Sequence, residues 1–388
     1  MTTNFTFNNG GTVTDTDDVF IRRDLFTTGG LWTWGGSLNG QLGDNTITHK
    51  SSPIQTVAGG TNWKLVAAGQ YNTAGIKSDG TLWIWGHNTH GQLGDNSVVW
   101  KSSPVQTVSG GTNWKQVACA GYHTLAIKTD GTLWLWGRNQ YGQMGNNTIT
   151  HRSSPVQTIA GGTNWKQVTG GAYHYCAAIK TDGTLWTWGF NSDGQLGDNT
   201  ITVKSSPVQT IAGGTNWKQV SSGRFHITAI KTDGTLWTWG YNNQGQLGEN
   251  TVASKSSPVQ TVAGGTNWKL VGSGNYHIAA IKTDGTLWNW GNNQAGQLGA
   301  NTTVPKSSPV QTIAGGTNWK QVTGGNNLNM AIKTDGTLWL WGRNFYGGLG
   351  TNDLVHRSSP VQTVAGGTNW KQVSSGYSSV SAIREDYY

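Results

Sequence analysis

Histidines are the side chains of this sequence whose type could bind a metal or transfer protons, and there are nine of them. Four precede a hydrophobic run at intervals of 51 or 52 residues: His123, His174, His226 and His277. A zinc site needs three or four ligands about 2.0–2.3 Å from one point, and one histidine per interval does not establish that convergence. We therefore expect these four histidines at equivalent places in the fold, in hydrogen-bonded structural roles. Neither a metal site nor a cofactor is expected.

Other groups with catalytic potential are equally dispersed. Glycine-rich stretches such as 160–163 precede strands, so they offer no helix N-terminus for a phosphate. Cys119 and Cys176 are expected to be buried thiols, and no serine lies in a nucleophile elbow. Single aspartates recur in Asp-Gly turns and do not form the carboxylate pair of a glycosidase: Asp79, Asp130, Asp182, Asp233, Asp284 and Asp335. The sequence thus predicts a protein that has no catalytic residues and is not an enzyme.

The elements that carry these groups form an internal repeat. The motif Trp-x-Trp-Gly occurs seven times, and its first tryptophans are separated by 51, 51, 52, 51, 51 and 51 residues. A period of roughly 40 to 50 residues with several short strands per unit is typical of a β-propeller, in which a single unit cannot bury its apolar face alone. The predicted fold class is all-β: a seven-bladed β-propeller of four-stranded antiparallel blades.

The unit that spans residues 164–211 illustrates the expected strands. Asp182 and the glycine after it supply the hairpin turn between the second and third strands, and Pro207 suits a fourth strand at the outer edge. Alternation places Trp186 and Trp188 on one face of the third strand, so we expect the indoles to form the layer between neighbouring blades. The four strands are predicted at residues 164–169, 173–180, 184–189 and 207–211.

A resemblance to a known family is clearest from Val271 to Gly299. This stretch reads Val-x-x-Gly-x-Tyr-His-x-x-Ala-Ile-Lys-Thr-Asp-Gly-Thr-Leu-Trp-x-Trp-Gly-x-Asn-x-x-Gly-Gln-Leu-Gly and resembles the repeat of the RCC1 family (regulator of chromosome condensation). The resemblance covers about residues 31–384 and implies a seven-bladed propeller. It implies the fold more firmly than an activity, because propellers host many unrelated functions.

The two ends of the sequence predict how the ring closes. The repeat is entered at a third strand, Leu31–Gly35, and is left after a first and a second strand, 370–383. Pairing of residues 377–383 with 31–34 would join these half-blades and remove an exposed sheet edge. We therefore expect a propeller domain at residues 31–388, preceded by a leader at residues 1–30 that serves as a docking arm, a cap or a terminal strand.

Two activities of the resembled family need features that this sequence lacks. Members that exchange nucleotide on a small GTPase use a wedge inserted in the propeller, whereas every unit here is 51 or 52 residues long. The plant ultraviolet photoreceptor branch senses light through tryptophans in Gly-Trp-Arg-His-Thr elements. The corresponding element here reads Gly121-Tyr122-His123-Thr124, and 21 of the 22 tryptophans occupy three repeated positions, which leaves only Trp100. Photoreception is therefore not expected, and exchange-like activity is kept only as an alternative.

Positions that differ between the repeats indicate where a partner could bind. They follow Trp-Gly, lie in the turn between the first and second strands, or precede the basic residue before Ser-Ser-Pro. In an up-and-down blade these connections share one face, and the nearly uniform Asp-Gly and Ala-Gly-Gly-Thr turns share the other. The predicted partner-binding residues on the varied face are His87, His90, Trp100, Arg138, Tyr141, Phe190, Arg224, Tyr241, Arg343, Phe345 and Tyr346.

Charge and hydropathy exclude further classes of function. The net charge of +8 comes from single basic positions repeated in each unit, so a nucleic-acid partner is not expected. No apolar run is long enough to span a membrane, and residues 1–30 do not read as a signal peptide. We expect a cytoplasmic or virion-associated protein.

The function predicted from these features is non-enzymatic binding through the varied face. We expect an accessory component of a larger assembly, such as a fibre or decoration protein of a phage virion, that contacts another protein or a particle surface, with residues 1–30 as a second point of attachment. One alternative is a glycan-binding propeller, because Trp100, Tyr141, Phe345 and Tyr346 could stack on sugars. Another is an intracellular adaptor or a regulator that acts like a guanine-nucleotide exchange factor.

Overall fold

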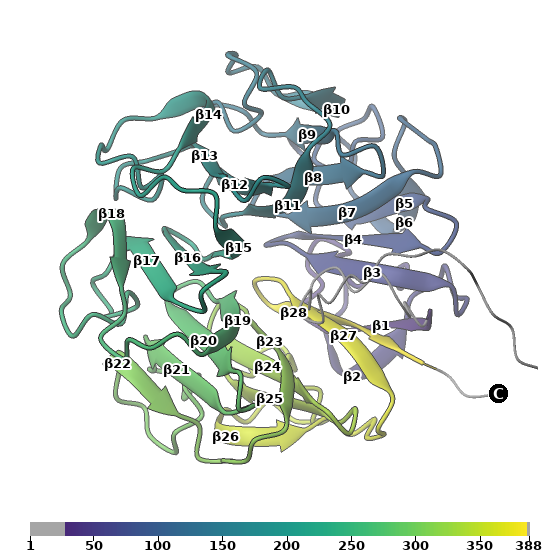
Figure 1. The fold of residues 1–388 in the computed structure, drawn as a ribbon. Coiled ribbons are helices and arrows are strands. Elements are labelled where there is room, and N and C mark those ends of the chain that lie inside the picture. Colours follow the sequence, from purple (N-terminus) through teal and green to yellow (C-terminus); the bar gives the residue numbers. More distant parts are fainter. Residues whose placement is uncertain (1–27, 386–388) are drawn as a thin grey trace, which may run out of the picture.

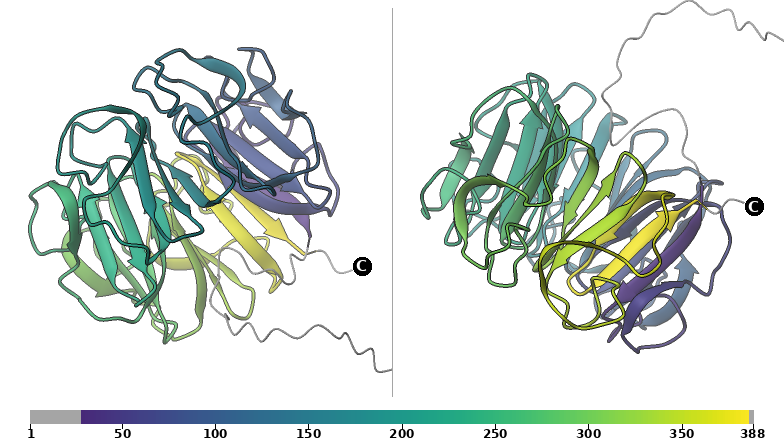
Figure 2. Two further views of the ribbon diagram at one scale, coloured as in Figure 1. Left: turned by 45° about the horizontal axis from the view of Figure 1, so that its top comes forward. Right: turned by 90° about the horizontal axis from the view of Figure 1, so that it is seen from below.

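The computed structural model describes residues 28–385, which form 28 β-strands and no helix. The strands build seven four-stranded antiparallel sheets that surround a central axis like blades (Figure 1). Side views show the sheets standing side by side around this axis (Figure 2). Within the described range, no helix has the length and apolarity that a membrane crossing requires. The predicted all-β, seven-bladed architecture is confirmed.

Six sheets each consist of four consecutive strands, and the first strand of each lies nearest the axis because first strands of neighbouring sheets contact one another. From the inner to the outer edge the sheets are β3 (Trp63–Ala68), β4 (Asn72–Lys77), β5 (Leu82–Gly86) and β6 (Lys101–Gln106); β7 (Trp114–Cys119), β8 (His123–Lys128), β9 (Leu133–Gly137) and β10 (Arg152–Gln157); β11 (Trp165–Gly170), β12 (Tyr175–Lys180), β13 (Leu185–Gly189) and β14 (Lys204–Gln209); β15 (Trp217–Ser222), β16 (His226–Lys231), β17 (Leu236–Gly240) and β18 (Lys255–Gln260); β19 (Trp268–Ser273), β20 (His277–Lys282), β21 (Leu287–Gly291) and β22 (Lys306–Gln311); β23 (Trp319–Gly324), β24 (Leu328–Lys333), β25 (Leu338–Gly342) and β26 (Arg357–Gln362).

The seventh sheet joins the two ends of the sequence, and we call it the closing blade. Its order is β27 (Trp370–Ser375), β28 (Ser379–Arg384), β1 (Gly30–Gly35) and β2 (Lys50–Gln55), so yellow and purple strands lie side by side in Figure 1. The pairing of β1 with β28 runs from Gly30 opposite Arg384 to Gly35 opposite Ser379. This confirms the predicted closure. Gly29 also exchanges backbone hydrogen bonds with Trp63, and the predictions for residues 1–27 lie outside the described residues.

The fourth strand of the unit begins earlier than predicted. β14 starts at Lys204, three residues before the predicted start at Pro207, and ends at Gln209. Its pairing with β13 is regular near Gln209, and the register shifts between there and Lys204, so Pro207 lies in a bulge at the outer edge of the sheet. A proline lacks the N–H of a ladder bond, and a bulged edge strand tolerates that loss. The other three strands begin one or two residues later than predicted.

The predicted equivalence of His174 with the other three histidines is wrong. Tyr175 pairs with Gly189, just as His226 pairs with Gly240 and His123 with Gly137 in their own sheets, so Tyr175 holds the equivalent place. The 52-residue unit carries one extra residue in its first turn. His174 absorbs this residue with a φ of 63°, a left-handed conformation that few residues other than glycine adopt.

The core consists of layers between neighbouring sheets. Trp188 is fully buried against the preceding sheet, and its Nε1 donates to the backbone oxygen of Gln143 there at 2.9 Å. Trp186 shares the same face of β13 but stays half-buried, with the Nζ of Lys180 4.7 Å from its ring centroid. The expected indole layer therefore consists mainly of the second tryptophan of each motif.

We expect Trp188→Phe to lower the free energy of unfolding by about 2–4 kcal/mol, because it leaves a cavity and reduces the hydrogen bonds to the buried Gln143 carbonyl to the weak one from Cys176 Sγ. Trp186→Phe is the matched control and should cost less than about 1 kcal/mol, since its indole is partly solvated and bonds only to Thr184. Urea unfolding monitored by circular dichroism measures both. Equal losses for the two variants would contradict this division of roles.

Candidate partner-binding face

The connections of each blade divide between two faces, as predicted. The first-to-second turns and third-to-fourth connections meet on one side, where Phe190 N–H donates to His174 O and Ala172 N–H donates to Gly223 O of the next sheet. The other two kinds of connection meet on the opposite side, where Trp165 N–H donates to Gly131 O. We call the first side the variable face and the second the uniform face.

Aromatic rings form a continuous series on the variable face, which we call the aromatic arc. Centroid distances between successive rings lie between 4.6 and 6.4 Å, and all of them stand in the inner turns between first and second strands. The arc spans six of the seven blades and is open at the β23–β24 turn, where Asn326 and Asn327 replace rings. In order, it comprises Tyr377, Tyr71, Tyr122, His174, Tyr173, Phe225 and Tyr276.

Most predicted binding residues pack against the outer side of this arc. Tyr141 lies between His174 at 5.4 Å and Phe190 at 4.9 Å, and Tyr241 lies 5.9 Å from Phe225. The remaining ring contacts join His87 to Trp100 at 4.6 Å and to Tyr122 at 5.6 Å, and His90 to Tyr122 at 5.5 Å. The structure thus gathers these side chains into one patch that extends across neighbouring blades.

Two arginines of the prediction are held by the arc itself. The Arg138 guanidinium lies 5.4 Å from the Tyr122 centroid, and its Nη2 donates to Gln140 Oε1 at 2.5 Å. Arg224 lies between three rings, with centroid distances of 5.8 Å to Tyr173, 5.2 Å to Phe225 and 5.5 Å to Tyr276. Cation–π contacts of this kind hold a charge in place without neutralising it.

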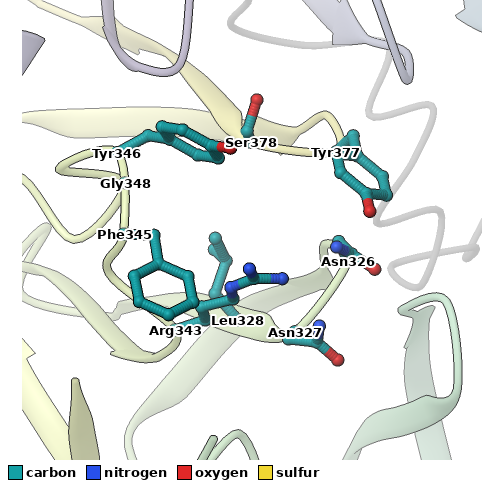
Figure 3. Close-up of a pocket in the computed structure, with 9 residues that line it drawn as sticks. All are labelled: Asn326, Asn327, Leu328, Arg343, Phe345, Tyr346, Gly348, Tyr377 and Ser378. Atoms are coloured by element: carbon teal, nitrogen blue, oxygen red, sulfur yellow. The ribbon is translucent and has the colours of Figure 1, made fainter. Parts of the chain in front are cut away.

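The other three predicted residues form a separate group at the opening of the arc. Arg343, Phe345 and Tyr346 belong to the β25–β26 connection, and Tyr346 crosses to the closing blade, where its ring lies 4.7 Å from His49. Together with the β27–β28 turn at Tyr377 they line a small recess that is open to solvent (Figure 3). Phe345 leaves 55% of its surface exposed.

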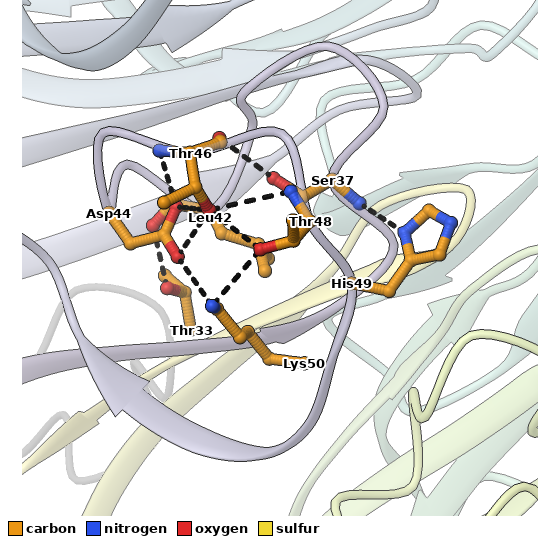
Figure 4. A network of polar contacts seen from close by, with 8 residues as sticks. All are labelled: Thr33, Ser37, Leu42, Asp44, Thr46, Thr48, His49 and Lys50. Atoms are coloured by element: carbon orange, nitrogen blue, oxygen red, sulfur yellow. Dashed lines mark hydrogen bonds and ion pairs between the residues drawn. The ribbon is translucent and has the colours of Figure 1, made fainter.

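The rim histidines have structural roles. His49 accepts the backbone N–H of Ser37 through Nδ1 at 3.0 Å, and His151 and His356 make the same bond in their own blades. Figure 4 shows the surrounding loop, in which Thr46 bonds to Asp44 and Lys50 pairs with Asp44 at 3.4 Å. These side chains tie each long connection to the start of its fourth strand.

A cysteine and a histidine meet in a way that the sequence analysis did not foresee. His123 Nε2 lies 3.2 Å from Cys176 Sγ, between neighbouring sheets. Burial lowers the pKa of His123 to about 3 and raises the pKa of Cys176 well above its ordinary value, so both groups stay neutral. Cysteine nucleophiles need a thiolate and access to solvent, and this fully buried pair has neither. Cys119, by contrast, is only half-buried.

Other chemistry-bearing groups are similarly confined. Among residues 28–385, no three His, Cys, Asp or Glu side chains are arranged to hold a metal ion. Asp182 accepts bonds from the Thr184 hydroxyl and backbone N–H, which lower the pKa of this turn carboxylate. The same contact recurs in the equivalent turns: Asp79, Asp130, Asp233, Asp284 and Asp335.

Most of the basic side chains that recur in each blade contact indoles or acidic side chains of the protein itself. Lys180 lies between the rings of Trp165 and Trp186, at 4.8 and 4.7 Å, and the equivalent cation of every other blade lies between two indoles as well. Four of the seven cations before Ser-Ser-Pro pair with an acid of their own connection, as in Lys204 with Asp198 at 3.6 Å. The positive charge of the protein therefore does not form a stripe that follows a nucleic-acid backbone.

The arc residues Tyr71, Tyr122, Tyr173, Phe225 and Tyr276 were absent from the predicted binding residues. The prediction counted the first-to-second turns among the varied positions but chose only Arg224 from them, although the residue at the next position is aromatic in five of the seven turns. A repeated aromatic residue in a turn was the available signal, because a turn position that does not serve the blade core has no packing reason to be aromatic.

His226 provides a test of the buried histidines. Burial lowers its pKa to about 3, while the unfolded polypeptide binds this proton near pH 6.5. Between these values the unfolded state binds more protons, so acidification destabilises the fold by on the order of 1 kcal/mol per pH unit. The variant His226→Leu copies the natural Leu328 of another blade. When the pH falls from 7 to 5, its free energy of unfolding should rise by about 1–2 kcal/mol relative to that of the wild type.

Reversible urea unfolding at pH 7, 6 and 5 measures this difference. The ring nitrogens of His226 have no hydrogen-bond partner among the described residues, so the leucine variant should fold normally at pH 7. Parallel pH profiles for the two proteins would show that His226 is protonated in the folded state and would overturn the assignment.

Comparison with known proteins agrees with this geometry. The RCC1-like domain model matches residues 173–387, and the regulator of chromosome condensation (RCC1) repeat model matches 28–76, 79–127 and 130–178. The ultraviolet-B receptor UVR8 of Arabidopsis thaliana is 31% identical over 336 residues, which cover 84% of this chain and 76% of UVR8. The mitochondrial RCC1 domain-containing protein RUG3 of the same plant is 26% identical over 86% of this chain and 82% of its own length.

Solved structures show the same fold at lower identity. Human WBSCR16 superposes with a TM-score of 0.82 and 21% identity, covering 92% of this chain and 99% of that one. Prp20p of Saccharomyces cerevisiae gives 0.82 with 17% identity and coverages of 93% and 92%. With family models matching from residue 28 to residue 387 and a relative above 30% identity, this chain belongs to the RCC1 family of seven-bladed β-propellers.

Proposed function

We propose that this protein is a non-enzymatic binding propeller that holds another protein through its variable face. The observation that carries the proposal is the contrast between the two faces. The variable face bears the aromatic arc with Arg138 and Arg224 held against it, while the uniform face repeats the same turns in every blade. If the residues of both faces served only the fold, the variable face would have no reason to differ from the uniform face.

The chemistry of the variable face suits a protein partner. Tyrosine, tryptophan and arginine dominate the energetics of protein interfaces, and rings that already pack on one another lose little conformational entropy on binding. Asp193 is the sole carboxylate among the described first-to-second turns and the four residues that follow each Trp-Gly. Farther along the connections, Asp44, Asp198, Glu249 and Asp353 are paired with cations of their own loops. A partner surface that offers acidic and apolar groups is therefore complementary. In the same family, yeast RCC1 (Prp20) has been solved with Kap60 bound to it.

We further propose that the protein is an accessory component of a larger assembly, such as a fibre or decoration protein of a phage virion. Near-identical repeats with turns rich in Thr, Asn and Gly support this role, because they build a rigid particle with little sequence variety. Residues 1–30 would then supply the attachment, and the variable face would meet the partner.

A glycan-binding role is the second candidate. Trp100 and Phe345 leave 48% and 55% of their surfaces exposed, and Tyr346 is also exposed, so each could stack on a sugar. Tyr141, which the sequence analysis grouped with them, is only half-exposed because it packs between His174 and Phe190.

Exposed side chains on the two faces provide a matched test of partner binding. Trp100→Ala combined with Phe345→Ala should reduce the affinity for the partner recovered from the native source at least tenfold, by about 1.4 kcal/mol or more. Ile211→Ala is the control, because Ile211 is 58% exposed in a connection of the uniform face. Affinities are measured by biolayer interferometry with the purified partner. Equal effects of both changes would contradict use of the variable face. If the wild type binds a glycan array and the double variant does not, the result would favour the lectin role.

The attachment role of the leader is tested by deletion. Because Gly29 bonds to Trp63 and β1 begins at Gly30, removal of residues 2–27 leaves every described strand in place. The shortened protein should keep its circular dichroism spectrum and unfolding midpoint but no longer copurify with particles from the native source. If the shortened protein stays on the particles, the anchoring role of the leader is refuted. The proposal for the variable face is not affected by that result.

A further inference from the structure

The recess at the opening of the aromatic arc exists because one blade breaks two repeated positions. Gly348 stands where the other six blades carry glutamine, and Leu328 stands where three blades carry histidine. Both residues line the recess, and Leu328 is buried at its base. The six glutamines are Gln41, Gln92, Gln143, Gln195, Gln246 and Gln297.

The glutamine that Gly348 replaces has a defined task in the other blades. Its Oε1 accepts the backbone N–H two residues earlier, as Gln92 does from His90 at 3.0 Å. In two blades its Nε2 also reaches the side chain that directly follows Trp-Gly. Gln92 meets His87 Nδ1 at 2.6 Å in this way, and Gln297 donates to Asn292 Oδ1 at 2.5 Å. The Nε2 of Gln143, Gln195 and Gln246, by contrast, has no partner among the described residues.

Arg343 occupies the position of His87 and Asn292. Because Gly348 has no side chain, nothing among the described residues fills the place beside Arg343 that glutamine fills in the other blades. Its guanidinium lies 4.3 Å from the Phe345 centroid, which holds the group in place. The Nε of Arg343 is buried without a hydrogen-bond partner, and no ion pair joins this arginine to a carboxylate among residues 28–385. Arg138, its counterpart in another blade, instead bonds to Gln140, a position that Phe345 takes here.

The groups around Arg343 add hydrogen-bond donors and no negative charge. Figure 3 shows the guanidinium extending into the recess toward Asn326 and the Tyr377 hydroxyl. Asn326 accepts a bond from Asn275 through Oδ1 at 2.7 Å, which leaves its amide nitrogen as a donor. No carboxylate belongs to the described lining. A buried N–H donor without a partner, such as Arg343 Nε, is costly, and a planar oxyanion is the group that matches the paired donors of a guanidinium.

We propose that this recess is a subsite for a carboxylate presented by a protein partner, either an acidic side group or the free carboxyl terminus of the partner. The inference rests on the proposed function and specifies the chemistry that the variable face recognises at one point. The carboxylate accepts from Arg343, with Asn326 and Tyr377 as further donors, while Phe345 and Tyr346 flank the partner segment that carries it. The recess opens to solvent, so a side group or a terminal residue of the partner can approach it.

Selective ¹⁵N labelling of arginine allows a direct test. The Nε–Hε signal of Arg343, identified by its absence from Arg343→Lys, should shift saturably with N-acetylglycine and not with neutral N-acetylglycinamide. The Arg138 signal is the internal control and should stay in place, because that guanidinium already bonds to Gln140. Equal shifts with the acid and the amide, or equal shifts at both arginines, would overturn the proposal.

Two variants complete the test by isothermal titration with the same probe. Gly348→Gln restores the residue of the other six blades, and its Cβ would meet only the flexible Leu328 side chain at 3.3 Å and Ser378 O at 3.6 Å, so the fold should be kept. It should weaken N-acetylglycine binding at least tenfold, as should Arg343→Lys, whereas Arg138→Lys should not. Unchanged binding in Gly348→Gln would refute the subsite.

The remaining outcomes distinguish this inference from the proposed function. N-acetylneuraminic acid, a sugar carboxylate, should bind no more tightly than N-acetylglycine, and tenfold tighter binding would overturn a protein source for the carboxylate. If probe binding is absent while Trp100→Ala with Phe345→Ala still loses the partner, the subsite is wrong and the proposed function stands.

Discussion

The structure depends on one interaction repeated around the ring. The second tryptophan of each Trp-x-Trp-Gly motif is buried between sheets and donates through Nε1 to a backbone oxygen of the preceding sheet, at 2.8 to 3.0 Å in all seven cases. No blade can satisfy this indole or cover its apolar face alone. Trp34 of the closing blade makes the same bond to Gly348, so the contact that joins neighbours also joins the two ends of the sequence.

The acceptor in this contact is a backbone oxygen, which leaves the side chain at that position free to change. Glutamine holds it in six blades, yet Gly348 supplies the same carbonyl without a side chain. A blade can therefore lose the glutamine and have a recess beside Arg343 without losing the bond that holds the ring together. The same separation explains how residues after Trp-Gly vary between units while the sheets stay alike.

Charge follows a similar division. One cation of each blade lies between two indoles, and four of the seven cations before Ser-Ser-Pro pair with an acid of their own loop. The histidines that start second strands are buried and neutral. On the variable face, Arg138, Arg224 and Arg343 lie against aromatic rings. Under the proposed function, these few fixed guanidinium groups would supply the recognition chemistry of a protein with net charge +8.

The sequence alone determined the fold class, the closure of the ring and the division into two faces, because period, alternation and strand order are local properties that repeat seven times. Only the tertiary structure decided what lies next to what. One inserted residue places His174 outside the position of the other histidines. His123 lies beside Cys176, and Tyr71 contacts Tyr377 across the closure of the ring. These contacts cross between sheets, so they depend on the angle and spacing at which blades pack, and no interval along the sequence encodes that geometry.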